Sequence, residues 1–214
     1  MGSLQTLVRV LILVVSVSAT VIAAHQTTST PLRTVRGGIL DEIVIYGNVP
    51  APKTVPVVAR PFSATADDLA AGGQKGELKK ETKDLQDRGP RLLVTELVTK
   101  LKEGEAFTSV TVLDGQSLPP SNALVVEGRF TMIDPGSQAK RYFVGFGAGK
   151  SGVAVWGSVK TSDGKLLATF VHKRIGVMGV AGGDSTAKLV SDATSIGEDI
   201  AKFLTAWVTG KKLK

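Results

Sequence analysis

Apolar positions near the end of the chain recur at helical spacing. The residues that share this stripe are Leu189, Ala193, Ile196, Ile200, Phe203, Leu204 and Trp207. Spacings of three and four predict an amphipathic helix whose stripe faces a core. Asp184 or Ser185 could cap its start, because both side chains accept hydrogen bonds from free N–H groups. Gly210 and the lysines that follow it are typical of a helix end.

A second helical pattern runs from Ala64 to Lys102, first polar and then apolar. Its apolar face is made by Leu93, Val94, Leu97, Val98 and Leu101. We expect that face to pack on a sheet. Gly89 and Pro90 predict a break in the pattern, because proline lacks an N–H donor and suits the first turn of a new helix.

Period-two alternation predicts strands in the second half of the chain. The first covers 123–133 and places on one face Leu124, Val126, Gly128, Phe130 and Met132. The second places on one face Val153, Val155, Gly157 and Val159. Its partner runs from Leu166 to about Arg174. Asp163 and Gly164 lie between these two strands and predict an antiparallel hairpin with a two-residue turn, because Asp-Gly supplies positive φ values.

Two shorter apolar runs complete the expected sheet. Ile43 to Tyr46 is rich in β-forming residues and suits a central strand buried on both faces. Val110 to Leu113 forms another strand. A strand, helices, further strands and a closing helix together predict an α+β fold, in which helices cover a mixed, largely antiparallel sheet.

The amino-terminal segment has the pattern of a secretory signal. Arg9 precedes an apolar run from Val10 to Ala24, and no acidic residue occurs before Asp41. The run is shorter than the about 20 residues that a membrane-spanning helix needs. We therefore expect a signal peptide over 1–24, a flexible lead-in over 25–38, a single domain over 39–210 and a basic tail over 211–214. A buried amino-terminal helix in a cytosolic protein is the alternative.

This signal predicts a periplasmic protein that is cleaved after Ala24, and an uncleaved segment would leave it anchored in the inner membrane. The net charge of +7 favours anionic surroundings, although ordinary solubility also explains it. Aromatic residues make up only 5% of the chain, so platforms for stacking nucleic-acid bases are scarce. The absence of cysteine excludes disulfides, thiolate nucleophiles and a lipid-modified amino-terminal cysteine.

The run from Gly145 to Ser151 is similar to a phosphate-binding loop, because glycines precede Lys150 and Ser151. Its spacing is wrong, since Val144 stands where such a loop needs glycine. The residues after Ser151 also alternate as a strand, whereas a phosphate loop leads into a helix. We expect a tight turn, with an anion-holding nest beside Lys150 as the second interpretation.

Catalytic constellations are otherwise missing from the sequence. His25 lies in the lead-in, and His172 at a strand position is expected to be a surface or packing residue. Four acids could be considered as catalytic acids: Asp134, Asp163, Asp184 and Glu198. Asp134 and Asp163 lie in predicted turns and Asp184 suits a helix cap, so structural roles suffice for them. A catalytic arrangement in which Ser151 is the nucleophile and His172 its base remains an alternative hypothesis. Neither residue has the strand-to-helix setting of a nucleophile elbow. We assign no catalytic, cofactor-binding or metal-binding residues and expect no cofactor.

Several segments of the second half are similar to an uncharacterised bacterial family, domain of unknown function 4410. They are Val126–Phe130, Asp134–Ser137, Arg141–Ser151 and Asp163–Lys165, within a match over roughly 39–208. The resemblance implies exported proteins, often lipoproteins, with the architecture of envelope assembly modules. It implies no reaction and no catalytic residue. This chain lacks the acceptor cysteine of the lipoprotein members, which favours a soluble periplasmic form.

These observations predict a non-catalytic, periplasmic or envelope-associated binding or assembly module, with a hydrolase of an envelope substrate as the alternative. The expected partner is an unknown envelope protein or an anionic envelope component, and neither nucleic acid nor nucleotide. Membrane association is expected only through an uncleaved signal segment. An apolar, glycine-interrupted run contains Ile175, Val177, Met178 and Val180, and it is either part of the core or an exposed interaction patch.

Overall fold

The computed structural model describes residues 30–48, 51–73, 80–115, 117–136, 150–176 and 185–214. Its strands are β1 (Arg33–Arg36), β2 (Glu42–Ile45), β3 (Val57–Ala59), β4 (Val110–Val112), β5 (Leu124–Asp134), β6 (Ser151–Thr161) and β7 (Leu166–Gly176). Its helices are α1 (Ala66–Ala71), α2 (Lys80–Glu103) and α4 (Ser185–Val208).

The strands form one seven-stranded sheet in the order β1-β2-β7-β6-β5-β3-β4. In this order, each neighbouring pair among β1, β2, β7, β6 and β5 is antiparallel. Strand β3 is parallel to both β5 and β4. The predicted α+β fold with a mixed, largely antiparallel sheet is therefore confirmed.

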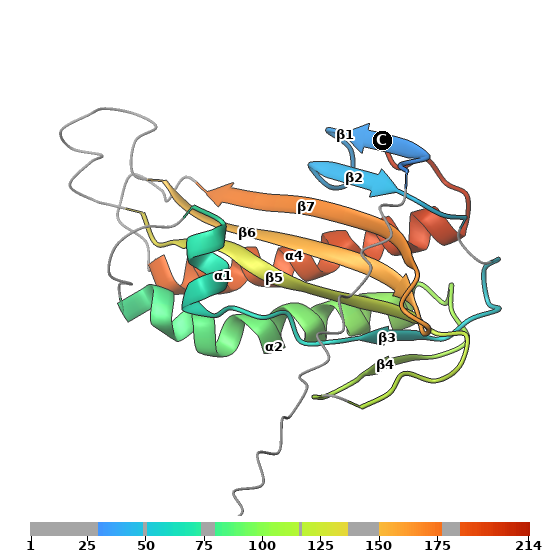
Figure 1. The fold of residues 1–214 in the computed structure, drawn as a ribbon. Coiled ribbons are helices and arrows are strands. Elements are labelled where there is room, and N and C mark those ends of the chain that lie inside the picture. The colour runs from blue at the N-terminus through green and yellow to red at the C-terminus, as the bar shows by residue number, and fades with distance from the viewer. Residues whose placement is uncertain (1–29, 49–50, 74–79, 116, 137–149, 177–184) are drawn as a thin grey trace, which may run out of the picture.

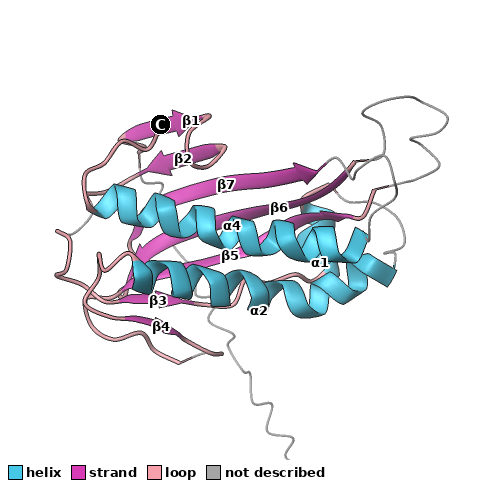
Figure 2. Cartoon of the chain, turned by 180° about the vertical axis from the view of Figure 1, so that it is seen from behind, coloured by secondary structure: helices cyan, strands magenta, loops and turns pink. Residues whose placement is uncertain are grey.

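The two long helices, α2 and α4, lie side by side on one face of the sheet (Figures 1 and 2). Every member of the predicted stripe on α4 is buried, as is the leucine stripe of α2. The helices approach closely at Gly197, where an added Cβ would lie 2.4 Å from the carbonyl oxygen of Leu93. Burial of these apolar stripes supplies most of the stabilisation of the two-layer arrangement.

Two paired glycines make room for an aromatic row in the core. Gly128 of β5 lies opposite Gly157 of β6. A Cβ at Gly128 would lie 2.4 Å from the ring of Phe62, and one at Gly157 would lie 2.2 Å from the ring of Phe170. The row continues from Phe170 to Phe203, with ring centroids 5.9 Å apart. The glycines are therefore required by the rings that pack on the sheet at these positions.

The predicted break at Gly89 and Pro90 is wrong, because α2 runs continuously from Lys80 to Glu103 with Pro90 inside it. Proline in a helix interior costs about 3 kcal/mol in isolation. Leu85, before the proline, and Leu93, after it, are both fully buried. Packing of one apolar face on both sides of Pro90 thus outweighs the local penalty.

The ends of the folded region also differ from the prediction. Arg33–Arg36, expected in the lead-in, form edge strand β1. Strand β2, expected at the centre of the sheet and buried on both faces, lies second from the edge and buries only alternate residues. At the other end Leu213, expected in the tail, is buried in the core. These differences arise from contacts between segments far apart in the sequence. Strand β1 pairs with β2 at the edge of the sheet, and Leu213 packs against the core.

Two predicted details of the strands need correction. The hairpin between β6 and β7 is present, but four residues connect the strands, and within it only Gly164 has a positive φ. In β5 the register shifts between Phe130 and Met132, so Ile133 is buried and Met132 is not. This β-bulge reverses the alternation that the sequence predicted for the end of the strand.

Candidate functional site

His172 lies in a polar cluster between β7, α4 and the residue before β2, in which His172 and Asp199 are buried and the other members are partly exposed. Its Nδ1 is 3.1 Å from Oδ2 of Asp41, and its Nε2 is 3.0 Å from Oδ2 of Asp199. His172 and Asp199 are 8% and 6% exposed. Because both ring nitrogens face carboxylates, the ring has no free nitrogen with which to take a proton from a substrate.

Arg174 and Lys202 complete the charges around Asp199. Nε of Arg174 donates to Oδ2 of Asp199 at 3.0 Å, and Nη2 donates to the same oxygen. Nζ of Lys202 is 3.5 Å from Oδ1. Burial by itself would raise the pKa of Asp199, but hydrogen bonds from His172 and Arg174 outweigh burial and lower it to about 2. Asp199 is therefore a carboxylate at neutral pH.

This cluster, which we call the His172 clasp, joins the amino-terminal strands to the rest of the fold. Besides contacting His172, Oδ2 of Asp41 accepts the backbone N–H of Lys173 at 2.7 Å. Asp41 directly precedes β2, while Asp199 belongs to α4. The clasp thus holds the β1–β2 pair against β7 and α4. His172 is a packing residue, which is one of the two roles that the sequence suggested.

Ser151 and His172 are not brought together. Ser151 pairs with Gly176, whereas His172 pairs with Val155 on the same two strands. Four strand residues separate the two positions, a distance of about 13 Å. Ser151 is fully buried, and among the described residues its hydroxyl has no hydrogen-bond partner. Within the described residues, His172 is therefore not placed to act as a base for Ser151.

The acids singled out from the sequence have structural partners where the structure describes them. Oδ1 of Asp134 accepts the N–H of Gly136 at 2.7 Å, as in a turn. The hydroxyl of Thr161 donates to Asp163 and lowers its pKa. Glu198 pairs with Lys202 at 2.8 Å. Asp184 lies outside the described residues, and so do the signal segment, His25, the 177–180 part of the apolar loop and Gly145–Gly149.

Lys150 and Ser151, at the end of the glycine-rich run, are described. Ser151 begins β6, an eleven-residue strand, and Lys150 is exposed just before it. The expectation that a strand follows this run is confirmed. A phosphate loop would place a helix amino terminus here, so the described geometry lacks the N–H groups that hold a phosphate.

The face of the sheet opposite α2 and α4 is open, as Figure 1 shows for its central strands. One row of side chains crosses five strands of this face through successive cross-strand pairs. From β1 to β5, the row consists of Arg36, Glu42, Val171, Trp156 and Arg129. The guanidinium of Arg129 lies 5.2 Å from the centre of the Trp156 ring, which is a cation–π contact.

Apolar side chains remain accessible on this open face. Val171 is 40% exposed and Ile175, further along β7, is 52% exposed. Some of the charged groups on this face are paired, since Glu127 contacts Lys160 at 2.5 Å and Arg60 at 3.9 Å. Arg129 contacts the Trp156 ring and has no ion pair with a described residue. An exposed apolar strip beside charged groups is typical of a surface that contacts another molecule.

Among the described residues, no group of three histidine or acidic side chains is placed to hold a metal ion. Within the same ranges, every helix is too short or too polar to cross a bilayer.

The fold and these sites define a two-layer α+β protein with a partly buried ionic clasp on one side of its sheet and an accessible, partly apolar surface on the other. The chain belongs to the family described as "Domain of unknown function (DUF4410)", which matches residues 57–180. The resemblance seen in the sequence is thus confirmed. The family has no assigned function, so membership names no reaction or partner.

Among solved structures, the chain is similar to the PelC dodecamer from Paraburkholderia phytofirmans, with 10% identity and a TM-score of 0.45 over 72% of this chain and 94% of that one. It is also similar to a crystal structure of an uncharacterized protein, with 12% identity and a TM-score of 0.43 over 74% and 96%. No curated protein matches the sequence.

Sequence reasoning missed the clasp. Asp192 and Asp199 are seven residues apart and lie beside the apolar stripe of α4, a spacing that places both on one side of the helix. Both are buried in the structure. Acids flanking an apolar stripe at this spacing were the available signal, but the partners of Asp199 on β7 could not be read from it. Asp192 pairs instead with Lys188 on α4 itself.

Proposed function

We propose that this protein is a non-catalytic binding or assembly module of the bacterial envelope, exported to the periplasm. The observation that carries the proposal is the open sheet face, where the side chains of Trp156, Val171 and Ile175 are accessible beside the paired charges of Glu127 and Lys160. Partner binding would bury this apolar surface, and an anionic group of the partner could pair with Arg129. The partner is an envelope protein or an anionic envelope component.

Two features support a role without chemistry. The ring nitrogens of His172 are both engaged by carboxylates, and the hydroxyl of Ser151 is enclosed. Export is supported by the short apolar run that ends at Ala24 and by the polar residues that follow it. An intact-mass measurement of the envelope fraction is expected to find a chain that begins just after Ala24. Recovery of full-length protein alone would favour an inner-membrane anchor.

Capture of partners from the native envelope tests the binding surface. Two substitutions, Val171→Glu and Ile175→Glu, place charges on the open face at exposed positions, so the fold is expected to persist. The matched control is Thr95→Glu with Thr99→Glu, which adds the same charge at exposed positions on α2. We expect the first pair to lose most of the partners that the unchanged protein recovers, as quantified by mass spectrometry. Equal recovery by all three proteins, at equal melting temperatures, would exclude this face as the interface.

A further inference from the structure

The helices α2 and α4 finish at the same end of the molecule (Figure 2), and lysines follow or occupy the last turn of each. Lys100 and Lys102 lie in the last turn of α2. Beyond α4 come Lys211, Lys212 and Lys214. Two adjoining hollows open at this end, one lined by both helix ends and one beside the end of α2.

The last four residues are part of the folded surface and do not form a tail. Lys211 N–H donates to the carbonyl of Ala206 at 2.8 Å, and the carbonyl of Leu213 accepts the N–H of Ile39 at 3.1 Å. The side chain of Leu213 is 2% exposed and belongs to the main core. Burial of Leu213 therefore fixes the lysines on either side of it at the surface.

The first hollow is a groove of about 550 Å³ between the helix ends. Four lysines line it together with Ile39, Ala201 and Ala206. Two of the lysines are neutralised, because Lys100 pairs with Glu103 and Lys202 with Glu198, both at 2.8 Å. The other two, Lys211 and Lys212, have no ion pair within the described ranges.

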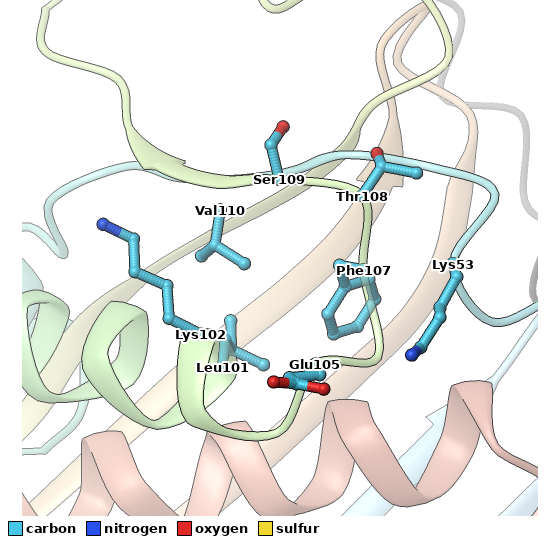
Figure 3. Close-up of a pocket in the computed structure, with 8 residues that line it drawn as sticks. All are labelled: Lys53, Leu101, Lys102, Glu105, Phe107, Thr108, Ser109 and Val110. Carbon is cyan, nitrogen blue, oxygen red and sulfur yellow. The ribbon is translucent and has the colours of Figure 1, made fainter.

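The second hollow, of about 350 Å³, carries two more lysines. Figure 3 shows Lys53 and Lys102 on opposite sides of it, with Phe107 and Glu105 between them. Neither lysine forms an ion pair with a described residue. We call the five unpaired lysines of both hollows and the carboxyl terminus the basic end: Lys53, Lys102, Lys211, Lys212 and Lys214.

Stabilisation of helix carboxyl termini explains only part of the basic end. Cations in the last turn offset the negative pole of a helix, and Lys102 has that position. Lys53 lies in the segment between β2 and β3, and Lys212 and Lys214 lie beyond the turn at Gly210. The helix dipole acts only within about one turn, so these three lysines need another explanation.

We infer that the basic end rests on an anionic phospholipid bilayer. Its charges come from three separate segments and surround two shallow hollows, so a single phosphate or carboxylate could meet only a few of them. A flat, extended anionic surface can contact lysines from several of these segments at once, and each lysine near such a surface contributes about 1 kcal/mol. Glu105, which lies between Lys53 and Lys102, offsets one of these charges. This inference rests on the proposed function, of which it names the anionic component, and it adds a membrane contact separate from the amino-terminal apolar segment.

Vesicle flotation of the full chain tests the inference. Binding is compared between vesicles of phosphatidylcholine alone and vesicles that also contain phosphatidylglycerol. We expect phosphatidylglycerol to increase binding, and the combined change Lys211→Gln, Lys212→Gln and Lys214→Gln to weaken the increase about 100-fold, since three lysines are removed. High salt should abolish the increase.

The matched control removes the same charge elsewhere through Lys83→Gln, Lys150→Gln and Lys173→Gln, all at exposed positions. It is expected to keep most of the phosphatidylglycerol-dependent binding. Equal losses in both triple variants would show that net charge, and not the basic end, attracts the protein. Binding that does not depend on phosphatidylglycerol would also overturn the inference. Neither result affects the test of the open sheet face, which measures partner recovery with different variants. The membrane inference can therefore be wrong while the proposed function holds.

Discussion

The two faces of the sheet differ in how far their side chains are exposed and in how their charges are paired, and neighbouring residues of β7 show the contrast. His172 points into the layer of helices, where every charge around it has a partner within the clasp. Val171 points the other way and is 40% exposed beside Trp156. Burial on the helix side demands complete pairing, because an unpaired charge there costs several kcal/mol. The open side has no such requirement and leaves apolar surface available for a partner.

The largest expected difference between the faces comes from two consecutive residues. Phe170→Ala removes a fully buried ring of the aromatic row and should lower the free energy of unfolding by about 3–5 kcal/mol. Val171→Ala should change it by less than about 1 kcal/mol, since its side chain is 40% exposed and its truncation leaves no enclosed cavity. Urea unfolding of both variants measures the two values. Similar losses would mean that the open face is covered in solution.

The clasp is expected to make stability depend on pH in the acid range. The pKa of Asp199 is about 2 in the folded protein and 3.8 for the ordinary side chain. Its stabilisation is therefore complete above pH 3.8 and is lost as pH falls through 2. Relative to Asp199→Asn, which cannot titrate, the protein should lose about 2 kcal/mol of unfolding free energy between pH 7 and pH 2. An unchanged difference between the two proteins across this range would contradict the ionised clasp.

The smallest effect is expected for the cation–π pair on the open face. Arg129→Gln removes the charge above Trp156 and should cost about 0.5–1 kcal/mol. Fluorescence of Trp156 should change as the guanidinium leaves, with Trp207 in the core as a constant background. The matched control is Arg91→Gln, at an exposed position of α2. A loss of more than about 3 kcal/mol of unfolding free energy would contradict this prediction, because only the removal of a buried charge partner costs that much.

The sequence by itself determined the elements whose pattern is long and regular. The stripe of α4 and the alternation in β6 and most of β5 follow from periodicity, because one face of each element is buried. Asp163 and Gly164 added the β6–β7 hairpin. The resemblance to an uncharacterised family was also visible in the residues of β5 and β6. Local signals were weaker guides, since Pro90 predicted a helix break that does not occur.

Only the tertiary structure decided which polar residues meet. Asp41 lies 131 positions from His172, and Asp199 lies 27 positions from it, so no spacing links them in the sequence. The same holds for the ends of the chain, where Leu213 packs into the core and carries the last lysines with it. Periodicity reports which face of one element is buried, because each residue carries that information locally. The identity of the neighbours depends on how all the elements pack, and that arrangement forms the clasp, the open face and the basic end.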